Sequence, residues 1–258
     1  MKRAIFYTII FAAIQVTIGM IVMAVWKLAT GQNPQSNVVC NIVMMTLASV
    51  VIIALFLMAK WAVVSPNWIR TRPWDVICWS AVAALGLLIP SMWFQELMPE
   101  LPNVAEDMFN GLISNPWGYV VIGLMAPLAE EIVFRGAILR ALLKWNENHW
   151  IGISISAVLF ALVHANPTQM PHAFLIGLLL GWMYYRSGSI IPGMVYHWVN
   201  NSAAFAVGHI LASVNANVED LTLKDLFGSN VWLAVVFSLL ILLPALYQLS
   251  LRLKKKEN

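Results

Sequence analysis

The chain has 258 residues, of which 60% are hydrophobic and 10% charged, and its net charge is +3. Soluble domains are about half apolar and a quarter charged, so these values exclude a soluble globular protein. The mean hydropathy of +0.77 predicts an all-α, polytopic integral membrane protein.

The N-terminal segment starts with Lys2 and Arg3 and continues with an apolar stretch over residues 4–26. A signal peptide has an apolar region of roughly 7–15 residues followed by a small-residue cleavage site. The segment is therefore predicted to be retained as the first transmembrane helix.

Membrane spans need about 20 apolar residues, and eight segments are candidates. They cover residues 4–26, 38–61, 75–95, 117–144, 150–165, 170–186, 190–212 and 230–250. The region 150–212 has short and interrupted segments, which a membrane tolerates only where they line protein or a water-filled cavity. We expect about eight transmembrane helices, with a polar cavity in the core. The outer loop, residues 96–116, is expected to contain a short surface helix.

The basic residues predict the orientation, because they favour the cytoplasmic side. With a cytoplasmic N-terminus, that side receives Lys2, Arg3, Lys60, Arg70, Arg72, Arg140, Lys144, Arg186, Arg252, Lys254, Lys255 and Lys256, and the opposite side only Lys27 and Lys224. The acids of the outer loops are Glu96, Glu100, Glu106, Asp107, Glu219, Asp220 and Asp225. Trp61, Trp68, Trp74, Trp145 and Trp150 cluster near span ends, as interfacial belts do. Both termini are predicted to be cytoplasmic, in a cell membrane that the short loops suggest is bacterial.

The cysteines and the C-terminal tail restrict the partners. Cys40 and Cys78 lie far apart in apolar segments, which supports neither a disulfide framework nor a cysteine metal site. The basic tail fits an anionic lipid surface better than nucleic acid. The bilayer is therefore an expected partner, and the sequence does not determine the oligomeric state.

Three ionisable residues lie inside the fourth predicted span, where such residues are functional candidates. Glu131 and Arg135 are four residues apart and can form an ion pair on one helix. Glu130 lies about 100° around the helix from Glu131, so the same arginine cannot satisfy both acids equally. A carboxylate without a close cation suits proton transfer.

Two later spans carry polar residues at helical spacing. Phe160 and His164 are four residues apart, as are His197 and Asn201, so each pair shares a helix face. His172 and His209 have no such helical partner and are assigned to packing. A glutamate, two histidines and an asparagine can activate water and stabilise an oxyanion, as peptide hydrolysis requires.

Other hydrolytic mechanisms fit less well. No serine has a G-x-S-x-G setting, the H-E-x-x-H motif of zinc proteases is absent, and only one aspartate, Asp75, lies near a span. Glu130, His164 and His197 remain an alternative three-ligand zinc site with one open position. Otherwise no metal or cofactor is expected.

The segments EEIVFR (130–135), FALVH (160–164) and HWVNN (197–201) resemble the three motifs of the CPBP intramembrane proteases, or Abi family, in the family's order. This family includes type II CAAX prenyl endopeptidases and bacteriocin-processing or self-immunity proteins. The resemblance covers roughly residues 117–205. It implies a glutamate-type intramembrane endopeptidase with a membrane-associated peptide or protein substrate.

The resemblance also implies roles for the motif residues. Glu130 and His164 activate the attacking water, and His197 and Asn201 stabilise the oxyanion. Glu131 and Arg135 support the site, and Phe160 packs beside the catalytic histidine. On this basis residues 1–258 form one membrane domain: residues 1–116 hold three spans and an outer loop, residues 117–212 the catalytic core, and residues 213–258 an outer loop, the last span and the tail.

Several predictions about the site and its function have alternatives. The spacing from His197 selects Asn201, and Asn200 is expected to face elsewhere. A simple span count puts His164 and His197 at opposite membrane depths, so the helices that carry them must be short, tilted or staggered. A transporter or a bacteriocin-immunity protein is the non-enzymatic alternative. Gly177 and Gly181 permit close helix packing, either internally or in a dimer.

Overall fold

The structure, a computed structural model, describes residues 1–64, 74–213 and 222–253. These residues form helices and no strands, which agrees with the predicted all-α class. The helices of 15 residues or more are α1 (Lys2–Thr30), α2 (Val38–Met58), α4 (Trp74–Glu96), α8 (His149–Val163), α9 (Met170–Ser187), α10 (Ile191–Ser213) and α12 (Val231–Arg252). Short helices α5 (Glu106–Ser114) and α11 (Leu223–Phe227) lie in the connections, and a 3-10 turn, η3 (Gly228–Asn230), precedes α12.

The fourth predicted span is one continuous helical segment with changing winding. It runs through η1 (Val120–Met125), α6 (Ala126–Glu130), η2 (Glu131–Leu139) and α7 (Arg140–Leu143), and η1 and η2 are π-helical. The span is therefore not an ordinary α-helix over its whole length. π-Helical turns are rare and are often found at functional sites.

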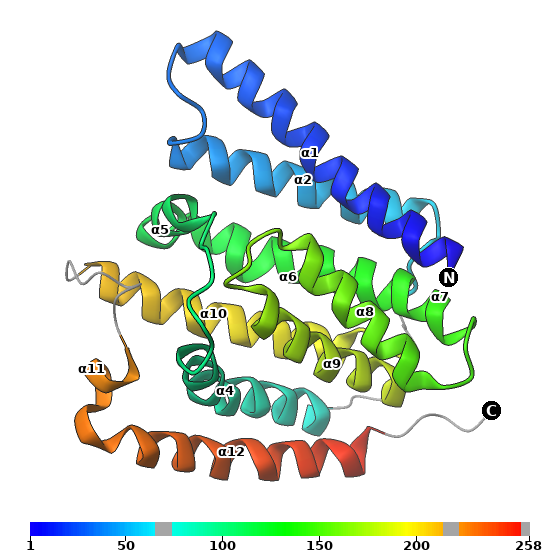
Figure 1. Cartoon of the computed structure of the whole chain (residues 1–258). Helices are drawn as coiled ribbons and strands as arrows, with labels where there is room; N and C mark the ends of the chain where they lie inside the picture. Colours follow the sequence, from blue (N-terminus) through cyan, green and yellow to red (C-terminus); the bar gives the residue numbers. More distant parts are fainter. Residues whose placement is uncertain (65–73, 214–221, 254–258) are drawn as a thin grey trace.

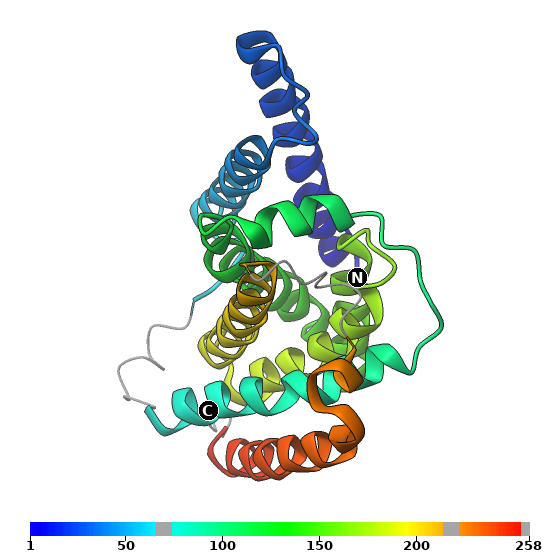
Figure 2. The ribbon, with the colours of Figure 1, turned by 90° about the vertical axis from the view of Figure 1, so that its left-hand side faces the viewer.

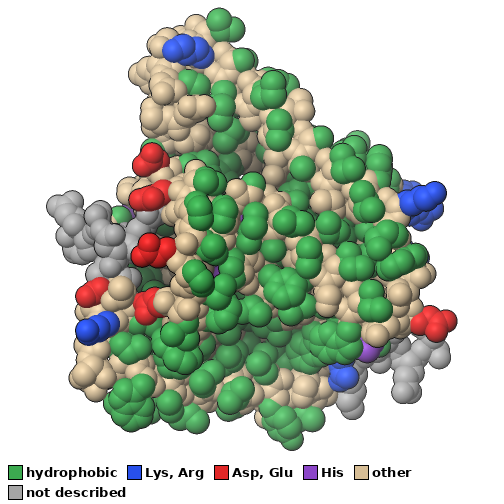
Figure 3. Space-filling model, viewed as in Figure 1, with side chains coloured by type: hydrophobic (Ala, Val, Ile, Leu, Met, Phe, Trp, Pro, Cys, Tyr) green, Lys and Arg blue, Asp and Glu red, His purple; other side chains and the backbone are tan. Residues whose placement is uncertain are grey.

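Each of the eight predicted spans coincides with a helical segment. Within the described residues, four helices are long and apolar enough to cross a membrane: α1, α2, α4 and the segment Leu223–Arg252. Together with the large hydrophobic side chains exposed on the surface (Figure 3), they make this a multi-pass membrane protein. The count of eight spans and the orientation of the termini stay predictions.

The helices form three groups (Figures 1 and 2). α1 and α2 make a hairpin along one side, and α4 and α12 pack together along the opposite side. Between them lie the central helical segment, α8, α9 and α10. These central helices carry many of the fully buried side chains, among them Phe134, Phe160 and Tyr196.

Local sequence signals set several helix ends. α1 ends at Gly31, whose φ of 71° is left-handed, and α9 ends in the same way at Gly188 with φ 67°. The side chains of Asn37 and Asn148 cap the first turns of α2 and α8. These signals keep α8 at 15 residues, so the predicted shortness in the region 150–212 is confirmed for this helix.

Close glycine contacts join α8 and α9. A Cβ atom on Gly177 would lie 3.0 Å from Ala157, and one on Gly181 would lie 2.9 Å from the side chain of Ile153. Both contacts are within this chain, so of the two expected uses of these glycines internal packing is confirmed. The predicted surface helix in the loop 96–116 is α5.

Some sequence expectations lie outside the described residues. These concern Trp68, Arg70, Arg72, Glu219, Asp220, Lys254, Lys255 and Lys256. Among the described residues, Cys40 and Cys78 are free thiols, as expected, although Cys78 is exposed rather than buried.

Candidate active site

The predicted ion pair between Glu131 and Arg135 is present in the centre of the bundle. Arg135 Nη1 donates to Glu131 Oε1 at 2.8 Å, and both side chains are at most 1% exposed. The guanidinium also lies 4.5 Å from the ring centre of Phe160 and donates to the carbonyl oxygen of Gly177 at 3.4 Å. This set of contacts compensates a buried charge that would otherwise be very unfavourable.

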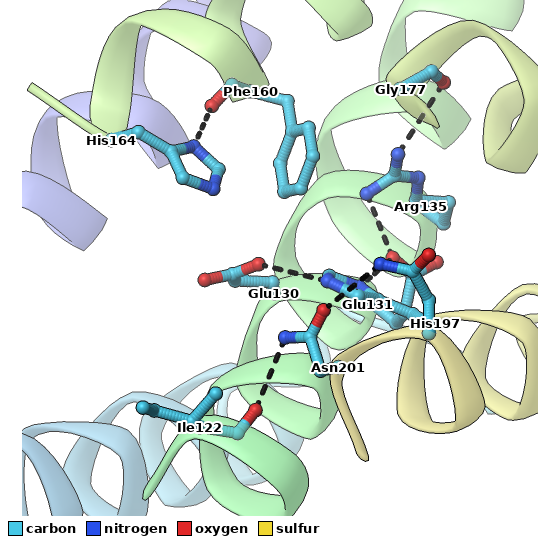
Figure 4. Close-up of polar contacts among 10 residues, drawn as sticks. Ile122, Glu130, Glu131, Arg135, Phe160, His164, Gly177, His197 and Asn201 are labelled. Carbon is cyan, nitrogen blue, oxygen red and sulfur yellow. Dashed lines mark hydrogen bonds and ion pairs between the residues drawn. The ribbon is translucent and has the colours of Figure 1, made fainter. Parts of the chain in front are cut away.

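His197 is held by the same carboxylate. Its Nδ1 atom lies 3.1 Å from Glu131 Oε1, and because this carboxylate is paired with Arg135 it accepts a hydrogen bond from Nδ1. Nε2 then faces Glu130, with 3.6 Å between Nε2 and Oε2 (Figure 4). His197 therefore lies between two carboxylates, one fixed and one 16% exposed.

A glycine makes this arrangement possible. A Cβ atom at Gly193, one turn before His197 on α10, would lie 2.9 Å from Glu131 Oε2. Any larger residue there would displace the carboxylate that orients His197. This contact joins two segments far apart in the sequence, so helical spacing could not predict it.

His164 lies at the C-terminal end of α8. Its Nδ1 atom is 2.7 Å from the carbonyl oxygen of Phe160, which can only accept, so Nδ1 carries the proton. In the neutral ring the Nε2 lone pair is then free to accept a hydrogen bond. The ring of Phe160 lies edge-on to both histidines, 4.8 Å from His164 and 5.9 Å from His197.

The loop after His164 is fixed by polar contacts. Ala165 has a positive φ of 50°, which is strained for a residue with a side chain. Asn166 is 1% exposed, accepts a hydrogen bond from the Val104 amide and donates to Asn103 Oδ1 at 2.8 Å. The loop over residues 96–116 therefore holds the turn that ends α8 at His164.

The two asparagines of α10 form a short polar chain. Asn201 Nδ2 donates to the carbonyl oxygen of Ile122 at 3.1 Å, and Asn200 Nδ2 donates to Asn201 Oδ1 at 3.4 Å. Both residues line the cavity described next. The expectation that Asn200 faces elsewhere is wrong.

A cavity of about 520 Å³ brings these residues together. Glu130, His164, His197 and Asn201 all line it, and Figure 4 shows these four side chains near one another. Apolar side chains from α2 and α5 also line it. The expected conflict in depth between His164 and His197 is resolved, because α8 is short and ends at the cavity. His172 also lines the cavity; the sequence analysis missed it because a loop separates it from His164, and periodicity does not extend across loops.

The alternative zinc site does not fit this arrangement. Among the described residues, no group of three or more His, Cys, Asp or Glu side chains lies close enough together to hold a metal ion. Glu130, His164 and His197 therefore share a cavity without forming a three-ligand set.

Comparison with known proteins finds a family model that matches the central part of the chain. Residues 112–203 match the family model described as type II CAAX prenyl endopeptidase Rce1-like. This match covers less than half of the chain, so the similarity to that family is shown for this segment. The matched segment includes all seven candidate residues, from Glu130 to Asn201.

Two curated relatives match a similar share of the chain. The UPF0177 protein YxdF of Lactococcus lactis subsp. lactis (strain IL1403) is 31% identical over 78 residues, which is 30% of this chain and 42% of that protein. An uncharacterized 24.3 kDa protein of Escherichia coli is 32% identical over 84 residues, which is 30% of this chain and 38% of that protein. The chain thus spans less than half the length of these relatives. No solved structure matches it significantly.

Proposed function

We propose that this protein is an intramembrane endopeptidase of the CAAX protease family that hydrolyses a peptide bond in a membrane-associated peptide or protein. The observation that carries the proposal is the single cavity lined by Glu130, His164, His197 and Asn201. Its volume of about 520 Å³ is in the range of small-molecule and short-peptide sites. The family match supports the reaction type.

Glu130 is the proposed general base. It borders the cavity, and the arginine of the site is hydrogen-bonded to Glu131 instead. Water held between the Glu130 carboxylate and the Nε2 lone pair of His164 loses a proton to Glu130 and attacks the carbonyl carbon. His164 orients the water by accepting its second hydrogen, because Nδ1 already donates to Phe160.

His197 and Asn201 are the proposed oxyanion donors. When His197 is protonated, Nδ1 donates to Glu131 and Nε2 donates to the oxygen of the tetrahedral intermediate. Asn201 has a second N–H besides the one bound to Ile122. The C–N bond then breaks, and the proton on Glu130 passes to the leaving nitrogen, which gives a carboxylic acid and an amine.

The test compares Glu130→Gln with the wild-type protein in cells. A strain that lacks the gene is complemented with either form or with Glu147→Gln, which changes an exposed acid in the α7–α8 connection. Membrane peptides are then compared by mass spectrometry. Products should form with wild type and Glu147→Gln, and Glu130→Gln should form them at least about 100-fold more slowly, the scale of a lost general base. Equal products with a folded Glu130→Gln protein would favour the non-enzymatic alternative.

A further inference from the structure

Asn200 is a buried polar residue that the proposed chemistry does not use. It is 5% exposed, lines the same cavity as Glu130 and His197, and has no hydrogen-bond partner for Oδ1 among the described residues. Buried acceptors are almost always paired, because an unpaired one loses its hydration without compensation. The orientation of this side chain therefore needs a physical reason.

The reason begins at Pro127. In the π-helical turn η1, the Ala126 amide donates to the carbonyl of Val121, five residues back. The next bond of that register would run from residue 127 to Ile122, but proline has no N–H. The carbonyl of Ile122 is thus left for a side-chain donor, and Asn201 Nδ2 occupies it at 3.1 Å.

The orientation of both amides follows from this carbonyl. Since Ile122 O can only accept, Asn201 must present Nδ2 to it and its Oδ1 to Asn200. Asn200 must in turn present Nδ2 to Asn201, which directs its own Oδ1 away from that bond. A flipped Asn200 would place two acceptors opposite each other. The polar chain therefore ends in a buried acceptor that has no partner among the described residues, on a side chain that lines the cavity.

We propose that Asn200 is a substrate-binding residue whose Oδ1 accepts a main-chain N–H of the bound peptide beside the scissile bond. This inference rests on the proposed function. None of the described residues that line the cavity is Lys or Arg, so the lining offers no cationic partner for Oδ1. A peptide main chain in an apolar cavity must find partners for its own N–H groups.

The proposal also restricts the conformation of the substrate. After the first four residues of an α-helix, each N–H is already bonded to the carbonyl four residues back. Away from a helix start, only an extended or unwound segment has an N–H free to donate to Asn200. The site therefore selects peptides that are extended at the bond to be cleaved, and a substrate that stays helical there is excluded.

The test combines a protein variant with a change in the peptide backbone. The probe is a quenched fluorescent peptide that the wild-type protein cleaves and Glu130→Gln does not. In a series of derivatives, each amide near the scissile bond is replaced in turn by an ester, which removes one N–H. For one derivative, kcat/KM of the wild type should fall about tenfold, the scale of one hydrogen bond to a buried group.

Asn200→Leu supplies the other arm of the experiment. It should lower kcat/KM for the all-amide peptide about tenfold and should lose no further activity with the sensitive ester. Asn41→Leu is the matched control, because Asn41 is equally buried, at 4% exposure, but lies on α2 away from the cavity lining. It should keep the ester sensitivity of the wild type. Asn200→Ser replaces Asn200→Leu if the larger apolar side chain prevents folding.

The outcomes separate the two proposals. If every ester reduces the activity of Asn200→Leu and the wild type by the same factor, Asn200 does not bind a main-chain N–H, and this inference alone is overturned. If no peptide is cleaved in a Glu130-dependent manner, the proposed function is overturned and the inference falls with it.

Discussion

Two arginine–carboxylate pairs of the same length lie in two different regions. Arg135 and Glu131 pair at 2.8 Å in the centre of the bundle, where both are at most 1% exposed. Arg252 and Asp75 also pair at 2.8 Å, where α12 meets α4, but their side chains are 34% and 57% exposed. The same N–O distance therefore occurs in a buried pair and in an exposed pair.

The same contrast holds for the regions as a whole. α4 and α12 are long apolar helices that pack through small and aliphatic residues such as Gly86 and Leu242. The central segment is irregular in its winding and carries Glu130, Glu131 and Arg135, and His164 directly follows the short helix α8. The long helices can be read as membrane spans from hydropathy alone, whereas the centre owes its structure to specific polar contacts. The difference suggests that changes in the centre affect activity and changes at α4–α12 affect only stability.

The largest expected effect comes from breaking the buried pair. Glu131→Ala leaves Arg135 charged and without its carboxylate, and should lower the free energy of unfolding by about 3–5 kcal/mol. Asp75→Ala breaks the exposed pair and should lower it by at most about 1 kcal/mol. Denaturation of both variants in detergent, followed by circular dichroism, measures the difference.

Glu131→Gln keeps the shape of the side chain and serves if the alanine variant does not fold. It should still be less stable than Asp75→Asn. Similar losses for the two pairs would contradict the view that burial, rather than contact distance, decides their strength.

A smaller effect is expected from glycines in the two regions. A Cβ atom at Gly86 would lie 2.8 Å from the backbone nitrogen of Leu242, so Gly86→Ala must push α4 and α12 apart. It should lower the free energy of unfolding by up to about 3 kcal/mol without changing kcat/KM of the folded protein. At Gly193 the near atom is Glu131 Oε2, the end of a side chain, so Gly193→Ala should lower kcat/KM about tenfold by shifting the support of His197.

Gly152, which also lies inside a helix, is the control for both the free energy of unfolding and kcat/KM. The nearest atom to a Cβ there is 3.5 Å away, so Gly152→Ala should be neutral or stabilise by up to about 1 kcal/mol. If Gly86→Ala lowered activity and Gly193→Ala lowered only stability, the division between the two regions would be wrong.

Much of the fold could be predicted from the sequence, because hydropathy and length act locally. Each predicted span coincides with a helical segment, and the Glu131–Arg135 pair follows from a spacing of four residues. The π-helical winding could not be predicted in this way. It is accompanied by the loss of a backbone donor at Pro127 and by packing from other helices, which hydropathy does not register.

The site was predictable in composition but not in contacts. Spacing identified the residues that line the cavity on each helix, such as His164 and His197. It could not show that Glu131 orients His197, because that contact crosses between helices and depends on Gly193. Spacing also placed Asn200 wrongly. The cavity is lined by both Asn200 and Asn201, and two adjacent positions do not share one helix face.

The smallest effects are expected from two asparagines at opposite ends of α8, the buried Asn166 and the capping Asn148. Asn166→Ala removes the hydrogen bonds to Val104 and Asn103 that fix the turn after His164. It should lower the free energy of unfolding by about 2 kcal/mol and should also lower kcat about tenfold with little change in KM, because His164 is displaced while the rest of the cavity remains.

Asn148→Ala removes the cap at the start of the same helix, where Oδ1 accepts from the Trp150 amide. It should cost about 1 kcal/mol of stability and leave kcat unchanged, since the Asn148 end of α8 lies away from the cavity lining. Steady-state kinetics and thermal unfolding of the two variants make the comparison. If kcat falls in both variants in proportion to their loss of stability, then the turn after His164 contributes to folding and does not position His164 for catalysis.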